Sequence, residues 1–467
     1  MESLNQGQVV ELAKSYEMVV RVRSLDQYFA GLLTLTPHKV VLHISGDLHE
    51  GRSHDFHPLH IPQLECHCLN LKFVLVDLRS TSSQVQSLDR NARLRHFEQT
   101  YEAEAALIVS GSFDSGQIDE VNIYSPAVTE WVGFTNAQHL YLSRADSDDL
   151  TTLDSILLVE VPGRGNIEVA CEMTSHYSQT TRSAGIGYDI YTNFSPSSLL
   201  TPRTALDFVE EFRTFFEVVE GGDPVIGKVH VTNGDAEGYI YYPTVGVRPR
   251  HALLRNLFPL GQDLLHPTGL PEFPASSLAV FFSLDHILME RWKKAVRYRH
   301  LGVIEDRFIG AFRLIEAFTL KRGKYIQDEE LLDRTLTRIR PMALKLFAPE
   351  KAQNVGQFLK RMRRWNLQRY SAPACLDQFY KTLPAELTTG WRYQASDIPD
   401  ICQKRNDITH ANSYFFSDLD LRSWTAFVET LLFVALMDSI SIPRASTLKI
   451  LPRLDSYSLL LKPRHDG

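Results

Sequence analysis

The sequence lacks the features that mark secreted and membrane-spanning proteins. Its five cysteines are odd in number and scattered along the chain, which argues against a disulfide framework and favours a reducing compartment. The first residues contain no apolar core of a secretory signal. The longest apolar run in the C-terminal half, LLFVALM, is far too short to span a bilayer. We therefore expect a cytoplasmic protein that has no membrane partner.

Motifs for several enzyme classes are also missing. No glycine-rich stretch has the lysine context of a phosphate-binding loop. The sequence contains neither a G-x-S-x-G nucleophile elbow nor an H-E-x-x-H zinc motif. Nucleotide hydrolysis and proteolysis therefore have little support, and we expect no cofactor.

The chain is acidic overall but contains one basic segment. The chain has a net charge of −7, yet residues 321–369 contain 13 Lys or Arg against 5 Asp or Glu, a local charge of +8 that leaves −15 for the rest. A basic segment on an acidic protein can attract a polyanion to one face. The alternative is an ordinary solvated helical surface.

Hydrophobic periodicity divides the 467 residues into a β-rich part and a helical part. Residues 1–200 alternate apolar and polar positions between Gly, Asp and Ser breaks, which predicts an antiparallel sandwich or barrel. Residues 201–275 read as a helix capped by Thr204 and two short strands that connect or complete this domain. The Pro-rich stretch HPTGLPEFPASS then leads into residues 276–467, which are nearly all helical. The predicted fold class is a multidomain α+β protein with an all-α C-terminal bundle.

The stretch CQKRNDITHANS places an arginine in the apolar stripe of a predicted helix. The helix should begin near Ser396 or Asp397, with Pro399 in its first turn. Ile398, Ile401, Cys402 and Ile408 fall on one side, and Arg405 lies at the centre of that side. Because an unpaired buried arginine costs several kcal/mol, Arg405 needs a carboxylate partner, a wet cleft or a bound anion.

Two polar residues follow Arg405 on the same helix. His410 lies about 140° round and roughly 7.5 Å along the axis, with Asn406 between the two directions. Histidine can transfer a proton near neutral pH, and arginine can stabilise the charge that develops on a phosphate. RNA supplies its own nucleophile, the 2′-OH group. Two copies of these residues across a two-fold axis would build a fuller site.

RNDITH has the spacing of the R-x4–6-H motif of HEPN domains, including the asparagine after the arginine. It lies on the expected penultimate helix of an all-α C-terminal region, where that family places it. The N-terminal stretches HKVVLHISGDLHEG and TEWVGF resemble those of ApeA-type proteins. The chain therefore resembles, over most of its length, the ApeA-type abortive-infection anti-phage proteins with a C-terminal HEPN domain.

The resemblance implies a metal-independent endoribonuclease that cleaves tRNA or another host RNA by 2′-OH attack and leaves a cyclic phosphate. Arg405 would bind the scissile phosphate, Asn406 would orient the site and His410 would act as general acid or base. Such domains dimerise through the motif helices and are restrained until a phage-derived trigger appears. Glu316 is our candidate for an acidic site residue from an earlier helix; as a buried partner of Arg405 it would serve structure equally well.

The non-catalytic interpretation stays open. The domain would then only bind RNA or a partner protein, with an Arg–Glu pair inside the bundle and a histidine at the helix end.

The segment FLKRMRRWNLQRY carries most of the basic charge together with aromatic residues. Interleaved cations and rings suit single-stranded or looped RNA, where phosphates are bound and bases stack. The alternative is an amphipathic helix with Phe358, Met362 and Trp365 turned inward. The predicted RNA-binding residues are Lys360, Arg361, Arg363, Arg364 and Trp365, with Tyr370 nearby.

A histidine-rich stretch near the N-terminus raises a second alternative. Zinc requires about four nitrogen or sulfur ligands, but the histidine spacing is irregular and the Cys-x2-Cys knuckle is absent. A metal-binding sensor therefore remains an alternative to a histidine-rich surface loop. The residues in question are His54, His57, His60, Cys66 and Cys68.

Overall fold

The computed structural model divides into two compact units. The first contains residues 1–293 and 439–442, and the second contains residues 294–438 and 443–467. The division therefore falls later than the expected boundary at 275–276. The structure describes residues 2–25, 27–49, 56, 59–87, 94–110, 113, 117–133, 154–178, 183–222, 224–244, 257–261, 269–321, 323–347, 352–366, 371–410 and 416–462.

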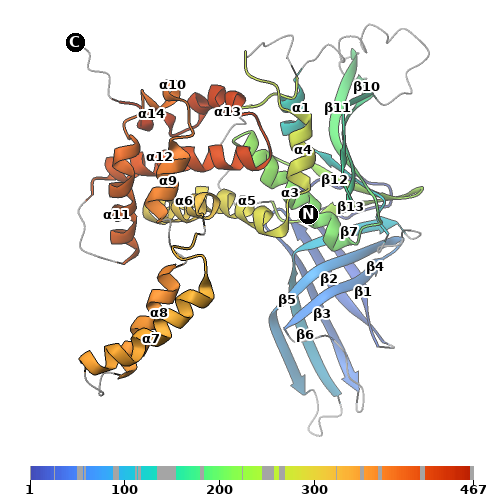
Figure 1. Cartoon of the computed structure of the whole chain (residues 1–467). Coiled ribbons are helices and arrows are strands. Elements are labelled where there is room, and N and C mark those ends of the chain that lie inside the picture. Colours follow the sequence, from blue (N-terminus) through green and yellow to red (C-terminus); the bar gives the residue numbers. More distant parts are fainter. Residues whose placement is uncertain are drawn as a thin grey trace. The chain divides into compact units, whose positions relative to one another are not determined.

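Six antiparallel strands close into a barrel in the first unit (Figure 1). They are β1 (Tyr16–Ser24), β2 (Gln27–Thr36), β3 (Lys39–His49), β4 (His60–Cys68), β5 (Leu71–Ser87) and β6 (Leu94–Ala103). β4 pairs with both β1 and β5, which completes the ring in the order β4-β1-β2-β3-β6-β5. Buried and exposed residues alternate along β1, as a strand with one face in a closed core requires.

Aromatic side chains fill part of the barrel interior. The ring of Phe29 lies 5.7 Å from that of Phe56 and 5.0 Å from that of Phe97 (centroid to centroid), both in edge-to-face contact. Such pairs add about 0.5–1.5 kcal/mol beyond the area that they bury. The barrel therefore has a packed core of its own.

The remaining strands continue the same hydrogen-bonded sheet beyond the barrel, and we call this continuation the second sheet. They are β7 (Ala105–Ser110), β8 (Glu120–Tyr124), β9 (Asp154–Val161), β10 (Gly165–Ser178), β11 (Ser183–Pro196), β12 (Lys228–Asn233) and β13 (Ala236–Tyr241). Starting from β5, their order is β7-β13-β12-β8-β11-β10-β9. The long strand β5 pairs with β6 through its second half and with β7 through its first half, so it belongs to both the barrel and the second sheet.

Helices α1 (Pro126–Val132), α3 (Pro202–Val219) and α4 (Ala275–Phe282) belong to the same unit as the strands. The ring of Phe208 on α3 stacks on that of Phe194 on β11 at 4.1 Å and on that of Phe282 on α4 at 5.2 Å. The indole of Trp131 donates a 2.7 Å hydrogen bond to the backbone carbonyl of Phe258. α3 is therefore held to the second sheet by an aromatic core.

The first turn of α3 differs from its sequence-based prediction. Thr204 is not the N-cap; the helix begins at Pro202, and Thr201 caps it. The side chains of Thr201 and Thr204 each bond the other's backbone N–H, at 3.3 and 2.9 Å. Proline suits the first helical position because it lacks the N–H that would be unsatisfied there. Arg203 is consequently part of the first turn.

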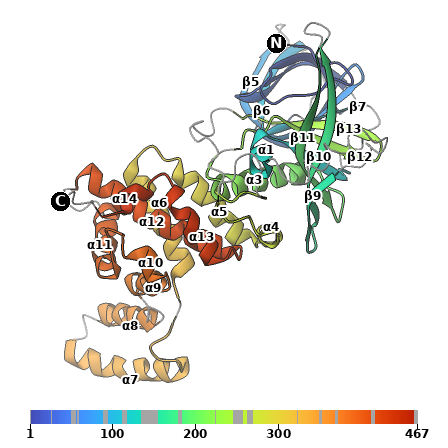
Figure 2. The ribbon, with the colours of Figure 1, turned by 90° about the horizontal axis from the view of Figure 1, so that it is seen from above.

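The second unit is helical (Figure 2). Its longest described helix, α12, is buried nearly all round, and Ser417 caps its first turn: Ser417 Oγ accepts from the Asp420 N–H at 3.1 Å. Among the described helices, none is long and apolar enough to cross a membrane. The elements are α5 (His286–Arg299), α6 (Ile304–Thr319), α7 (Glu329–Phe347), α8 (Ala352–Asn366), α9 (Ala372–Tyr380), α10 (Ala385–Thr388), η2 (Ala395–Asp397), α11 (Ile398–Thr409), α12 (Asp418–Ser439), α13 (Arg444–Ile450), η3 (Leu451–Arg453) and α14 (Tyr457–Leu460); α5 and α12 each have one end in the first unit.

α7 and α8 form a helical hairpin that has a small hydrophobic cluster of its own. The cluster consists of Leu332 and Leu336 from α7 and Val355 and Leu359 from α8, with Met362 packed at its edge. α7 continues through Pro341.

The carboxamide of Asn366 fixes the end of α8. It accepts from the N–H of Ile326 at 2.7 Å and donates to the carbonyl of Ile326 at 3.0 Å.

The structure confirms the β-rich N-terminal region followed by a helical C-terminal region that the sequence predicted.

Candidate functional site

Helix α11 presents the arginine motif as the sequence predicted. It follows the short η2 turn, begins at Ile398 with Pro399 in its first turn, and ends with His410 as its C-cap. Ile398, Ile401 and Cys402 are buried, whereas Ile408 is half-buried. The apolar stripe therefore packs most closely over the first two turns of the helix.

Arg405 is engaged by residues of α6. Its Nη2 donates a hydrogen bond to Oε2 of Glu316, and its guanidinium carbon lies 5.2 Å from the centroid of the Phe312 ring. The two charged side chains are 23% and 20% exposed, so the pair is largely but not fully removed from water. The sequence left two roles open for Glu316, an acidic site residue or a buried partner of Arg405. The structure shows the ion pair with Arg405.

Asn406 completes the contacts of the guanidinium group. Its Oδ1 accepts from Nη1 of Arg405 at 2.9 Å. The Nε atom of Arg405 is buried and has no hydrogen-bond partner in the described part of the chain. A buried donor without a partner costs about 1–3 kcal/mol, so the arrangement is not optimised for stability alone.

His410 is in a different environment from the other three residues. It is exposed, and its backbone N–H bonds the Asn406 carbonyl at 2.9 Å. Its side chain makes no hydrogen bond or ion pair with Arg405, Asn406 or Glu316. Residues 411–415, which follow directly, lie outside the described residues. Within one chain the structure thus brings together Arg405, Asn406 and Glu316, with the imidazole at the exposed helix end.

A second charged pair anchors α6, which carries Glu316. The guanidinium of Arg307 bonds both carboxylate oxygens of Glu429 on α12, with Nη2 to Oε2 at 2.7 Å. Burial lowers the pKa of Arg307, but its hydrogen bond and charge interaction with Glu429 outweigh this effect, so the pKa is raised. The position of Glu316 is therefore set by a helix tied to the buried α12.

Cys402 lies beside the same cluster, one turn before Asn406. Burial raises the pKa of its thiol to about 12, and the negative charge of Glu316 adds to the effect while Arg405 opposes it. The thiol is consequently uncharged near neutral pH. It packs in the core and does not offer a thiolate nucleophile.

The basic residues of α8 are exposed on the helical hairpin. Phe358 and Trp365 are 54% and 53% exposed, so the alternative that turned both rings inward is wrong, while Met362 is half-buried as that alternative expected. Both rings remain outside because the four-residue cluster and Met362 already fill the face between α7 and α8. Arg363 pairs with Asp333. Lys360, Arg361 and Arg364 are exposed and make no ion pair within the described chain; Tyr370 lies outside it.

The structure gives the zinc alternative no additional support. Cys66 points into the barrel, and burial raises its pKa, which disfavours the thiolate that a metal needs. His60 bonds Asp77 at 2.6 Å. Among the residues that the structure describes, no three His, Cys, Asp or Glu side chains come together as a metal site. His54 and His57 lie outside those residues.

Glu316 was anticipated as a site residue, but two other neighbours of the arginine, Phe312 and Cys402, were not. Phe312 and Glu316 lie one turn apart on α6, and this i, i+4 spacing is the only sequence signal that links them. Cys402 was expected only as part of the apolar stripe. The sequence does not reveal that α6 faces α11, because Glu316 and Arg405 are almost ninety residues apart in the chain.

Comparisons of the chain with protein-family models, with curated proteins and with solved structures find no match.

Proposed function

We propose that the protein is a metal-independent endoribonuclease of the HEPN type that acts in anti-phage defence, as the resemblance of its motif implies. The observation that carries the proposal is the cluster of Arg405, Asn406 and Glu316, followed at the exposed end of α11 by His410. These are the groups that phosphate binding, orientation and proton transfer require.

In the proposed reaction the RNA 2′-oxygen attacks the adjacent phosphorus while the bond from phosphorus to the 5′-oxygen breaks. A base accepts the 2′-hydroxyl proton, an acid protonates the departing 5′-oxygen, and a 2′,3′-cyclic phosphate remains. Two subunits would supply two His410 side chains, one for each proton transfer. Arg405 would stabilise the additional negative charge on the phosphate.

Arg405 needs some freedom to serve in this way. In one chain its Nη atoms contact Glu316 and Asn406, yet its side chain is 23% exposed. A phosphate oxygen could therefore be bound while Glu316 keeps the guanidinium plane in place. On this view Glu316 and Asn406 position Arg405, and they need not contact the RNA.

The α7–α8 hairpin supplies the proposed RNA contact. Lys360, Arg361 and Arg364 carry positive charge that no described carboxylate neutralises, and Trp365 exposes an aromatic face beside them. Base stacking on such a ring contributes about 1–3 kcal/mol per base.

A non-catalytic RNA- or protein-binding module is the second candidate. The observation that favours it is the same ion pair, because a guanidinium held by Glu316 over the ring of Phe312 also stabilises a helical bundle. Only activity measurements separate the two functions.

The test uses full-length protein, total tRNA and EDTA. We expect cleavage that persists in EDTA, produces cyclic-phosphate ends and disappears in His410→Ala and Arg405→Ala. Thr409→Ala, next to His410 and also exposed, is the matched control and should keep activity. Binding of RNA without cleavage, unchanged in His410→Ala, would favour the non-catalytic module.

A further inference from the structure

A pocket of about 1100 Å³ opens in the N-terminal unit between the barrel and the start of α3. Its lining comes from β4, β5, β6 and Arg203 of α3. The volume is at the upper end of the range for small-ligand sites. None of these residues was anticipated from the sequence as part of a site.

The pocket lies where β5 passes from the barrel to the second sheet. β6 ends at Ala103 and β7 begins at Ala105, so Glu104 lies between two strands that both pair with β5. On the other edge of β5, the pairing with β4 skips Pro62 and Asp77. Proline has no N–H to give to a strand partner, which accounts for the interruption.

Asp77 occupies this interruption with an unusual backbone. Its φ of 51° is in the left-handed region, where residues other than glycine are uncommon. Its carboxylate accepts from His60 at 2.6 Å and from Nη2 of Arg79 at 3.1 Å. The hydrogen bond from His60 is the main cause that lowers the pKa of Asp77, so the group is ionised and fixed near neutral pH.

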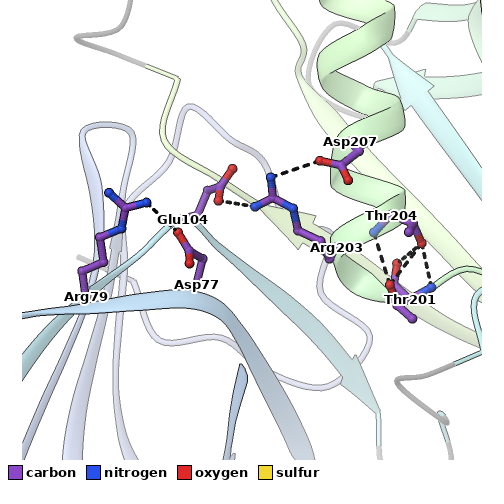
Figure 3. Close-up of polar contacts among 7 residues, drawn as sticks. All are labelled: Asp77, Arg79, Glu104, Thr201, Arg203, Thr204 and Asp207. Carbon is purple, nitrogen blue, oxygen red and sulfur yellow. Dashed lines mark hydrogen bonds and ion pairs between the residues drawn. The ribbon is translucent and has the colours of Figure 1, made fainter. Parts of the chain in front are cut away.

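Arg203 contacts two acidic residues on the α3 side of the pocket. One Nη atom donates to Glu104 and the other contacts Asp207 at 3.1 Å (Figure 3). Asp77 and Glu104 lie between the guanidinium groups of Arg203 and Arg79 in this view. Arg203 thus lines one wall of the pocket, and two carboxylates balance its charge there.

Arg79 and Glu102 are the two charged groups of the pocket that have the fewest partners: Arg79 bonds Asp77 through one nitrogen, and Glu102 makes no ion pair with a described residue. They are directly opposite each other on β5 and β6, where Cβ atoms are about 5 Å apart and an ion pair is expected. The structure instead turns Arg79 to Asp77 through one nitrogen, with 76% of its side chain exposed. Glu102 is exposed and makes no ion pair with any described residue. One positive and one negative group therefore face the same pocket without neutralising each other.

We propose that this pocket binds a small zwitterion, an amino acid or a short peptide, whose carboxylate is held by Arg79 and whose ammonium group is held by Glu102. A polyanion such as a nucleotide fits less well. The lining has three carboxylates, from Asp77, Glu102 and Glu104, against two guanidinium groups, of which Arg203 contacts two carboxylates and Arg79 contacts one.

The test measures binding to full-length protein by calorimetry and thermal shift. The probes are the twenty free amino acids and trialanine, with N-acetyl-trialanine and trialanine amide as analogues that each lack one charge. We expect at least one zwitterion to bind with a Kd below about 1 mM and both capped analogues to bind at least about ten-fold more weakly, since each analogue loses one hydrogen bond to a charged group. A comparison of the free amino acids with trialanine shows whether the pocket prefers a single amino acid or a short peptide.

Variants then assign each charge. Glu102→Gln should lower the affinity for the zwitterion about ten-fold, and N-acetyl-trialanine should then bind as well as trialanine. Arg79→Gln should also lower this affinity about ten-fold, and trialanine amide should then bind as well as trialanine. Glu17→Gln on the exposed face of β1 is the matched control. Both pocket positions are exposed, so circular dichroism should report an unchanged fold. The proposal is overturned if no zwitterion binds, if binding survives both variants, or if inorganic phosphate or ATP binds more tightly than every zwitterion through Arg79 alone.

Discussion

Arg405 on α11 and Glu316 on α6 form an ion pair between two helices of the C-terminal unit, over the ring of Phe312. The pair makes Arg405 important for both stability and the proposed chemistry. Activity loss in an Arg405 variant is consequently ambiguous on its own. The most informative variants separate these two roles.

His410→Ala should separate activity from stability. The side chain is exposed and makes no hydrogen bond or ion pair in the described structure, so the melting temperature should change little. Loss of a general acid or base should slow RNA cleavage about 10²–10⁴-fold. Initial cleavage rates beside a thermal scan provide the measurement. A variant with full activity excludes the proposed role of the imidazole.

Arg405→Ala should lower both the rate of RNA cleavage and the free energy of unfolding. It leaves Glu316 half-buried without its cation, and breaking a fully buried pair costs about 3–5 kcal/mol. Because both side chains remain about one-fifth exposed, we expect a smaller loss of about 1–3 kcal/mol.

The double variant Arg405→Ala/Glu316→Gln should recover part of this stability without recovering cleavage. Denaturant unfolding measures the first effect and an RNA assay the second. Recovery of cleavage would show that Arg405 acts only through structure.

Charge removal on α8 should weaken RNA binding without unfolding the protein. Changing Lys360, Arg361, Arg363 and Arg364 to Gln together should reduce the slope of log Kd against log salt by about two to three. Arg363 contributes least because Asp333 already pairs with it. The matched control removes four cations from the barrel strands: Arg21, Arg23, Lys39 and Arg95. An equal change of slope in both variants would mean that the hairpin is not the RNA contact.

Leu336→Ala should make the α7–α8 hairpin unfold locally while the rest of the helical unit stays folded. The side chain is 7% exposed and belongs to a cluster of only four buried residues, so the cavity should cost about 2–5 kcal/mol within a small core. Limited proteolysis should then cleave within α7 or α8. Leu346→Ala on the same helix, where the side chain is 81% exposed, should have no such effect.

Glu220→Gln tests a buried carboxyl group in the first unit. Burial raises the pKa of Glu220 well above its ordinary value, and neither carboxylate oxygen has a hydrogen-bond partner in the described chain. An acid whose folded-state pKa is raised destabilises the fold as the pH rises above the unfolded-state pKa, because the unfolded chain releases its proton first.

The Gln variant lacks this ionisation. It should therefore gain stability relative to the parent as the pH is raised from 4 to 8, and the gain should vanish below the ordinary carboxyl pKa. Melting temperatures of both proteins across this range provide the measurement. A difference that does not depend on pH would contradict the assignment.

Local patterns in the sequence determined much of the secondary structure and the arginine motif. The start of α11 beside Pro399, its end at His410 and the Ser417 cap of α12 were all predictable, because capping and helical periodicity depend on residues within a few positions of one another. The alternation of buried and exposed residues along β1 is equally local.

Only the tertiary structure decided which distant segments meet. Closure of the barrel through β4, the contact of Arg405 with Glu316 and the exposure of Trp365 all depend on pairings between elements that no short pattern encodes. The pocket at Asp77 has the same origin: β5 changes partners there, and Arg203 arrives from a helix more than one hundred residues later. Sequence spacing fixes the direction of a side chain on its own element, whereas its partner is set by the packing of the whole unit.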